Sequence, residues 1–238
     1  GNGQRPAGLR MAAEYFYGDR AGYERFVDTR CCSGAAPGRL YAFAKRAFDV
    51  AAALAGLFLL LPLLPFIVLL IKLETPGPVL FRQKRVGRCG RLFDCFKFRS
   101  MAIDAETRKD QLRHLNEANG AAFKIKDDPR ITGVGRFLRR SSLDEFPQLL
   151  NVLRGEMSIV GPRPQIPGEV ADYTPQEAQR LLVKPGLTCL WQVSGRSHLD
   201  FSEWMELDRQ YVAAAGPGLD FRILVRTLPA VIQRKGAY

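Results

Sequence analysis

The feature that most constrains this chain is an uncharged, strongly apolar run at residues 50–71. Its length is close to the ~20 residues that a helix needs to cross a bilayer. Pro62 and Pro65 lie inside the run, and each removes a backbone donor and clashes with the preceding helical turn. We therefore expect two helices joined by a break, neither long enough to cross ~30 Å of hydrocarbon by itself.

Positive charge lies on both sides of this run. The flanking cations are Arg39, Lys45 and Arg46 before it, and Lys72, Arg82, Lys84 and Arg85 after it. Because the positive-inside rule places both flanks on the cytoplasmic side, a segment that enters one leaflet and returns fits the pattern. A proline-kinked helix that crosses the membrane fits about as well, so the residues alone leave both topologies open.

The composition points to an anionic partner. The 238 residues are 47% hydrophobic, which is enough for a sizeable core, and 35 Lys and Arg against 24 Asp and Glu give a formal charge of +11. Phosphates, nucleic acid and an acidic membrane surface all fit this charge. The five cysteines and two histidines lack the spacing of a zinc site, so no zinc is expected.

After the apolar run the pattern changes to a period of two. Residues 79–101 contain two strand-like stretches around the turn GRCG, which predicts a β-hairpin. Phe96 and Phe98 alternate with Lys97 and Arg99, so a strand places both cations on one face. Such a face is usually only solvated, but two cations at one place can also bind a diphosphate. With helical patterns at 102–120 and near the C-terminus, the expected fold is α+β, mostly helical, with a small sheet.

Two adjacent acids, Asp144 and Glu145, stand in the stretch SSLDEFPQLLN at 141–151. Ser142 and Glu145 have the spacing of a capping box, which would give the acids a structural role. That register places Pro147 inside the helix, whereas a cap at Asp144 removes this conflict. In either register the expected buried stripe is Leu143, Phe146, Leu150 and Leu153.

Arginines surround the acidic pair. Arg139 and Arg140 precede it, and Arg163 lies between two prolines in VGPRP, on a stiff backbone. Fixed guanidinium groups suit bidentate recognition of phosphate. An acid can attack phosphorus only if the phosphate charge is offset, so arginines and a divalent metal are its expected companions. The acids are therefore candidates for phosphoryl chemistry as well as for a helix cap.

Several longer motifs occur in a fixed order: KRAFDV, FRQKRVG, KFRSM, DDPRIT, SSLDEFPQLLNVLRGEMSIVGPRP and KPGLTCLWQVSGR. In this order they resemble the bacterial sugar transferase family, the monotopic phosphoglycosyl transferases that begin exopolysaccharide and O-antigen assembly. The resemblance covers residues 44–238. It implies a monotopic protein of the bacterial inner membrane with an N-terminal arm at 1–40, a re-entrant helix–break–helix at 41–73, and a cytoplasmic catalytic domain with amphipathic membrane-surface helices at 74–238.

The resemblance also implies an activity. A sugar 1-phosphate would pass from a UDP-sugar, with UDP-glucose or UDP-galactose favoured, to undecaprenyl phosphate, with Mg²⁺ as cofactor and UMP as product. Asp144 matches the nucleophile that forms a phosphosugar-aspartyl intermediate, Glu145 matches its partner, and both would hold the metal. The implied substrate-binding residues are Lys97, Arg99, Arg139, Arg163 and Arg196. Inner-leaflet phospholipids are further expected partners, nucleic acid is not, and a homodimer is left open.

Two departures and two alternatives accompany this interpretation. Cys189 stands where the family usually has glycine, and AAAGPGLD lacks the aromatic residue often found before the last helix. A non-enzymatic membrane-anchored module binding anionic lipid or nucleic acid would explain the charge and the apolar run, but not the acids among arginines. A polyprenyl-linked phosphatase would share the acids and the metal, but it would release phosphate instead of UMP.

Overall fold

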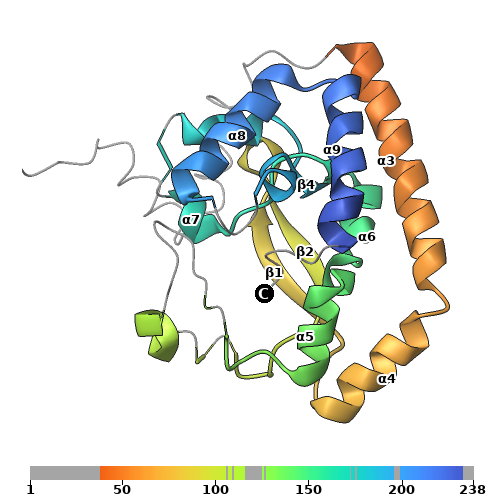
Figure 1. Cartoon of the computed structure of the whole chain (residues 1–238), viewed down its shortest axis with the longest axis vertical. Coiled ribbons are helices and arrows are strands. Elements are labelled where there is room, and N and C mark those ends of the chain that lie inside the picture. Colours follow the sequence, from red (N-terminus) through yellow and green to blue (C-terminus); the bar gives the residue numbers. More distant parts are fainter. Residues whose placement is uncertain are drawn as a thin grey trace, which may run out of the picture.

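The computed structural model describes residues 38–105, 107, 108, 110–115, 125, 127–171, 173, 174, 176–195 and 199–232. Helices are combined with two small two-stranded sheets in this part of the chain (Figure 1). The α+β class expected from the sequence is therefore confirmed. Residues 1–37 of the expected N-terminal arm lie outside the described residues, as does Arg196.

The apolar run forms two helices, α3 (Arg39–Leu60) and α4 (Leu64–Glu74), which are bent by 64° at the break between them. Pro62 lies in the break, and Pro65 lies in the first turn of α4, where a missing N–H costs no helical bond. No single helix among the described residues is long and apolar enough to cross a membrane. The two helices of the bent pair, taken together, have the length and the apolar composition of a membrane-crossing segment. The expected division into two helices is confirmed.

The expected hairpin is confirmed as well. Strands β1 (Leu80–Val86) and β2 (Leu92–Phe98) pair in antiparallel register around a short 3-10 helix, η1 (Arg88–Gly90). Phe96 lies on the opposite face of β2 from Lys97, covered by the guanidinium groups of Arg82 and Arg154 at 5.6 and 4.8 Å from its ring centroid. Because successive side chains of a strand point to opposite faces, Lys97 projects from the face of β2 that these two arginines do not cover.

A hydrophobic core surrounds helix α6 (Gln148–Arg154) and strand β3 (Ser158–Val160), which pairs in parallel with β4 (Gly186–Thr188). Helices α8 (Phe201–Ala214) and α9 (Pro217–Ile232) contribute to the core, and α3 lies along one side of the molecule (Figure 1). The buried members of this core are Ala53, Phe93, Cys95, Leu149, Val152, Met157, Ile159, Val160, Tyr211 and Ile223.

Polar groups fix α3 to this core. Asp49, only 3% exposed, accepts hydrogen bonds from the Ser158 hydroxyl at 3.0 Å and the Ile159 amide at 2.9 Å. Arg46 donates to the carbonyl groups of Val152 and Leu153 at the end of α6, at 2.6 and 2.7 Å. The first half of the apolar run is thus joined to α6 and β3, the elements that flank the candidate site.

Short helices complete the described chain: η2 (Asp110–Leu115), α5 (Gly133–Arg140), η3 (Leu143–Glu145), α7 (Pro167–Ala171), η4 (Glu177–Leu182) and η5 (Trp191–Val193). The exposed helix expected over 102–120 is wrong for the part of it that is described, which contains turns and the 3-10 helix η2. A polar segment without an apolar face to bury gains too little from packing to hold a long α-helix.

Candidate active site

The acidic pair lies on a short turn between α5 and α6. Leu143–Glu145 form the 3-10 helix η3, and Ser142 before it has a left-handed backbone (φ 57°) and makes no side-chain cap. Helix α6 begins only at Gln148, with Pro147 as its N-cap residue. Both helix registers expected from the sequence are therefore wrong. The proline stays outside the helix because the chain makes a separate turn before it.

The buried stripe of this segment is displaced for the same reason. The buried residues of α6 are Gln148, Leu149, Asn151 and Val152, whereas Leu150 is 37% exposed. Asn151 uses its buried position to join α6 to β2, because its side chain accepts from the Phe96 amide at 3.1 Å and donates to the Asp94 carbonyl at 2.7 Å. Helix α6 and the strand that carries Lys97 are thereby held in one register.

Glu145 is bound by two cations. Lys97 on β2 donates to its Oε1 at 2.9 Å, and Arg163 donates to both carboxylate oxygens, at 3.2 Å to Oε2 and over a shorter distance to Oε1. Burial alone would raise the pKa of Glu145, but the charges of Arg163 and Lys97 hold it well below its usual range. Glu145 is therefore an ionised carboxylate in a bidentate clamp, and its carboxylate is not used for the expected capping box.

Asp144 has a different environment. Its side chain is buried, with 7% of the residue exposed, and it accepts no hydrogen bond from any residue that the structure describes. Burial and then the neighbouring charge of Glu145 raise its pKa to about 6, against the opposing charges of Lys97, Arg139 and Arg163. Near neutral pH the carboxylate is therefore mostly ionised, and it makes no hydrogen bond to the described part of the chain, which suits a nucleophile.

Arg139 reaches the acids from the last turn of α5. Its Nε donates to the Ser100 hydroxyl at 2.9 Å, and its charge interacts with that of Asp144. Together, Lys97, Arg139 and Arg163 bring three positive charges to the acidic pair from three different parts of the chain. This is the grouping of cations around an acid that phosphate chemistry requires.

Arg99 is not brought to the acidic pair. Its guanidinium group donates to the Thr75 and Pro76 carbonyls, each at 2.7 Å, and to the Thr75 hydroxyl at 2.8 Å. These bonds fix the segment that connects α4 to β1. Arg99 follows β2 instead of continuing it, so the alternation that predicted a shared face with Lys97 ends one residue too early.

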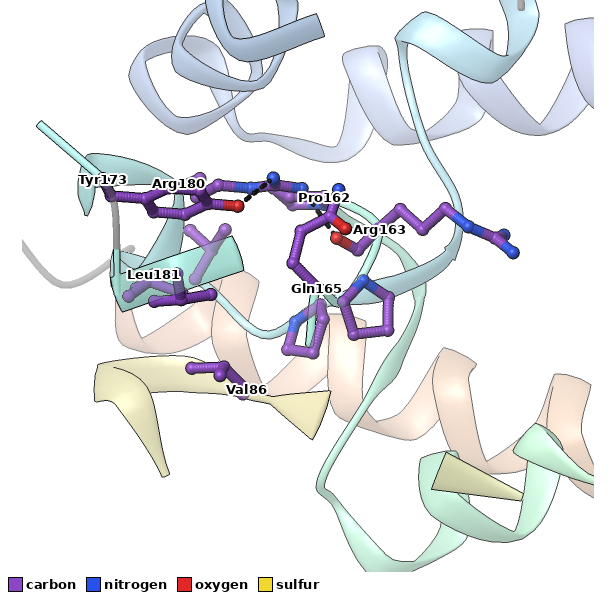
Figure 2. Close-up of a pocket in the computed structure, with 12 residues that line it drawn as sticks. Val86, Pro162, Arg163, Gln165, Tyr173, Arg180 and Leu181 are labelled. Atoms are coloured by element: carbon purple, nitrogen blue, oxygen red, sulfur yellow. Dashed lines mark hydrogen bonds between the residues drawn. The ribbon is translucent and has the colours of Figure 1, made fainter. Parts of the chain in front are cut away.

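Arg180 holds the backbone of Arg163 in place. Arg180 on η4 donates to the Arg163 carbonyl at 2.6 Å and to the Tyr173 hydroxyl at 2.8 Å, and it forms a buried ion pair with Asp208 at 2.8 Å. Figure 2 shows Arg180 between Tyr173 and the loop at 162–165, while the guanidinium group of Arg163 points away from this pocket. Arg180 and Ser100 were not predicted as site residues: Ser100 lies in KFRSM, but no motif contains Arg180.

The carboxylates of Asp144 and Glu145 are the candidate ligands for a divalent metal ion. In the part of the chain that the structure describes, no cluster of three or more His, Cys, Asp or Glu side chains could hold a metal ion. Mg²⁺, however, often binds proteins through one or two carboxylates and takes its other oxygens from water and substrate phosphates. Asp144 and Glu145 fit an ion that arrives with a diphosphate.

Comparison with known proteins gives a consistent result. The family described as bacterial sugar transferase matches residues 40–234. The chain is 45% identical over 195 residues to the galactosyl transferase CpsE of Streptococcus agalactiae, covering 82% of this chain and 43% of that protein. It is 42% identical over 200 residues to the undecaprenyl-phosphate galactose phosphotransferase of Salmonella typhimurium, covering 82% of this chain and 42% of that protein.

A shorter relative aligns over most of its length. The exopolysaccharide production protein ExoY of Rhizobium meliloti is 41% identical over 199 residues, which cover 82% of this chain and 88% of that protein. This chain thus spans about two fifths of the first two relatives and most of the third. The family match covers most of the chain and includes the acidic pair and its three cations. The chain therefore belongs to the bacterial sugar transferase family.

Proposed function

We propose that this protein is a phosphoglycosyl transferase that moves a sugar 1-phosphate from a UDP-sugar to undecaprenyl phosphate and releases UMP. The observation that carries the proposal is the buried Asp144 carboxylate, which makes no hydrogen bond to the described residues and lies beside Glu145 and three cations. Relatives named as undecaprenyl-phosphate galactose and glucose phosphotransferases support both the lipid acceptor and a hexose as the sugar. The reaction would be an early membrane step of exopolysaccharide or O-antigen synthesis.

In the first half-reaction, an oxygen of the ionised Asp144 carboxylate attacks the β-phosphorus of the donor. The bond from that phosphorus to the bridging oxygen breaks, UMP leaves with the bonding electrons, and a phosphosugar-aspartyl ester remains. Arg139 and Arg163 offset the charge on the phosphate oxygens during this step, and Lys97 adds a third positive charge. Because no described residue donates a hydrogen bond to Asp144, its lone pairs are available for the attack.

In the second half-reaction, a phosphate oxygen of undecaprenyl phosphate attacks the same phosphorus. The acyl phosphate bond breaks, Asp144 returns to a carboxylate, and the product is a lipid-linked diphosphosugar. Two separate steps suit a site served from two phases, because the soluble donor can react and depart before the lipid arrives. Mg²⁺ held by Asp144, Glu145 and the donor diphosphate would neutralise phosphate charge when bound.

The bent helix pair supports a location at the membrane. Large apolar side chains are exposed along α3 and α4, among them Phe58, Leu59, Leu61, Phe66, Leu69, Leu70 and Leu73. Soluble proteins rarely expose so many neighbouring large apolar side chains to water, and a bilayer would cover them. We infer that the pair enters one leaflet of the inner membrane from the cytoplasmic side and returns, since positive charge flanks both ends.

The proposal is tested by incubating the purified protein, reconstituted with phospholipid, with Mg²⁺, undecaprenyl phosphate and a panel of UDP-sugars. We expect UMP release with one of the UDP-hexoses, and none from Asp144→Asn. Release of inorganic phosphate without UMP would favour a phosphatase. Lipid or nucleic-acid binding that weakens steeply with salt, without any reaction of a nucleotide sugar, would favour a non-enzymatic module.

A further inference from the structure

The last residue of the bent helix pair caps the helix that carries Arg139. Glu74 ends α4, and its carboxylate accepts hydrogen bonds from the Gly133 amide at 2.6 Å and the Val134 amide at 3.0 Å. These are the first two residues of α5, whose amides have no partner within their own helix. Thr132 satisfies only the third, through its hydroxyl and the Gly135 amide at 2.9 Å. The start of α5 is therefore completed by a residue from α4.

Apolar packing joins the same two helices. Ile67 and Ile71 of α4 are buried in one cluster with Leu138 of α5, and Val134 packs against that cluster. Leu143 and Phe146, the residues on either side of Asp144 and Glu145, pack against it as well. The turn that holds the candidate nucleophile thus packs on a core to which α4 contributes Ile67, Ile71 and the partly buried Leu64.

Helix α5 is short and stiff, so a movement of its first residues would also move Arg139 in its last turn. A Cβ atom at Gly135 would overlap the backbone of Ser100, so α5 lies directly on that backbone. Arg139 then donates to the Ser100 hydroxyl at 2.9 Å. Eight residues of α-helix are only ~12 Å long and behave as a stiff unit. The Glu74 cap and the Arg139 guanidinium are the two ends of this unit.

We propose that Glu74 is a positioning residue that acts through Arg139, and that it links the seating of the bent helix pair to the phosphate site. The inference rests on the proposed function and adds a positioning residue to it. With α4 in place, the carboxylate of Glu74 holds the start of α5 and Arg139 faces Asp144. Without that cap, α5 loses two hydrogen bonds and the fixed position of its last turn, so turnover falls while donor binding at Lys97 and Arg163 persists.

A double-mutant cycle of Glu74→Gln and Arg139→Lys tests this proposal in the lipid-reconstituted full chain. The glutamine keeps the acceptor facing Gly133 but turns an N–H toward the amide of Val134. We expect Glu74→Gln to lower kcat for UMP release about tenfold and to change KM for the UDP-sugar less than about twofold. In the Arg139→Lys background, the same change is expected to lower kcat less than about twofold further. Glu74→Asp, which keeps both acceptors and the charge, is expected to restore part of the loss.

Glu203→Gln is the matched control, because Glu203 also accepts a backbone amide at a helix start, that of Asp200 at 2.8 Å, but belongs to α8. It is expected to leave kcat unchanged. Full kcat in Glu74→Gln, or a tenfold loss that is equally large in the Arg139→Lys background, would overturn the proposal. If Glu74→Gln does not fold, the cycle is repeated with Glu74→Asp, whose smaller loss of kcat is also expected to shrink in the Arg139→Lys background; an equal loss in both backgrounds would overturn the proposal. Absence of UMP release from the unmodified protein would instead contradict the proposed function.

Discussion

Arg163 holds the carboxylate of Glu145, the residue directly after Asp144, through hydrogen bonds to both of its oxygens. Lys97 holds the same carboxylate from β2 at 2.9 Å. Two cations of the kind that bind phosphate thus share one internal carboxylate. Under the proposed function, phosphate oxygens of the donor would compete with Glu145 for these cations, and the charge of Glu145 also raises the pKa of Asp144.

Replacing this internal anion changes nucleotide affinity in a defined direction. Without Mg²⁺, we expect Glu145→Gln to bind UDP about tenfold more tightly, or about 1.4 kcal/mol, because Arg163 and Lys97 lose their anionic partner. Turnover with Mg²⁺ should fall. Calorimetric titration with UDP measures the affinity, and Glu206→Gln on the exposed face of α8 is the control. Unchanged or weaker UDP binding without Mg²⁺ would contradict this role.

The pH dependence follows from the environment of Asp144. Because burial and the charge of Glu145 raise its pKa to about 6, the attacking carboxylate is lost as the pH falls below that value. Single-turnover UMP release should rise about tenfold per pH unit below pH 6 and level off above pH 7. In Glu145→Gln the rising limb should move to lower pH. A limb near pH 4 in the unmodified protein would mean that Asp144 is not perturbed.

The same carboxylate costs stability at neutral pH. Folded Asp144 keeps its proton up to about pH 6, whereas the unfolded chain releases it near 3.8, so the folded state binds more protons between these values and loses stability as the pH rises through them. Asp144→Asn should therefore raise the free energy of unfolding by up to about 3 kcal/mol at pH 7.5 and leave it nearly unchanged at pH 4. Thermal unfolding in one detergent at both pH values measures this, and a destabilised variant at pH 7.5 would be contrary to expectation.

Arg99 and Arg163 are expected to have different roles, the first in stability and the second in substrate binding. Its three hydrogen bonds to Thr75 and Pro76 predict that Arg99→Met loses about 1–3 kcal/mol of stability. KM for the UDP-sugar should change less than about twofold, whereas Arg163→Met should raise KM more than about tenfold. Steady-state kinetics and thermal unfolding of both variants distinguish the roles. A large KM effect in Arg99→Met would return Arg99 to the substrate site.

The sequence predicted the features that depend on local chemistry. Pro62 and Pro65 predicted the division of the apolar run, because proline lacks a backbone N–H and clashes with the preceding helical turn. Period-two alternation around GRCG was sufficient for the hairpin, and Asp144, Glu145, Lys97, Arg139 and Arg163 do come together. Residue chemistry singled out these acids and cations together with Arg99 and Arg140, and the resemblance to a family then assigned their roles.

The parts that were missed depend on contacts distant in sequence. The turn at 142–147 could not be placed, because the partners that draw Glu145 away from a cap come from β2 and from the loop after β3. The role of Arg99 depends on the backbone of 75–76, and that of Arg180 on the carbonyl of Arg163. Glu74 is an ordinary helix-end residue in the sequence, and only the fold brings it to the start of α5.

The central claim, that Asp144 forms a covalent bond to phosphorus, is tested most directly by peptide mass spectrometry of the protein after reaction. The protein is mixed with Mg²⁺ and its UDP-sugar in the absence of undecaprenyl phosphate, quenched in acid and digested. We predict one equivalent of UMP, a mass increase of one sugar phosphate on the peptide that contains Asp144, and loss of the adduct when the lipid is added. Asp144→Asn should show neither. UMP release without any adduct, or an adduct on another residue, would contradict the account.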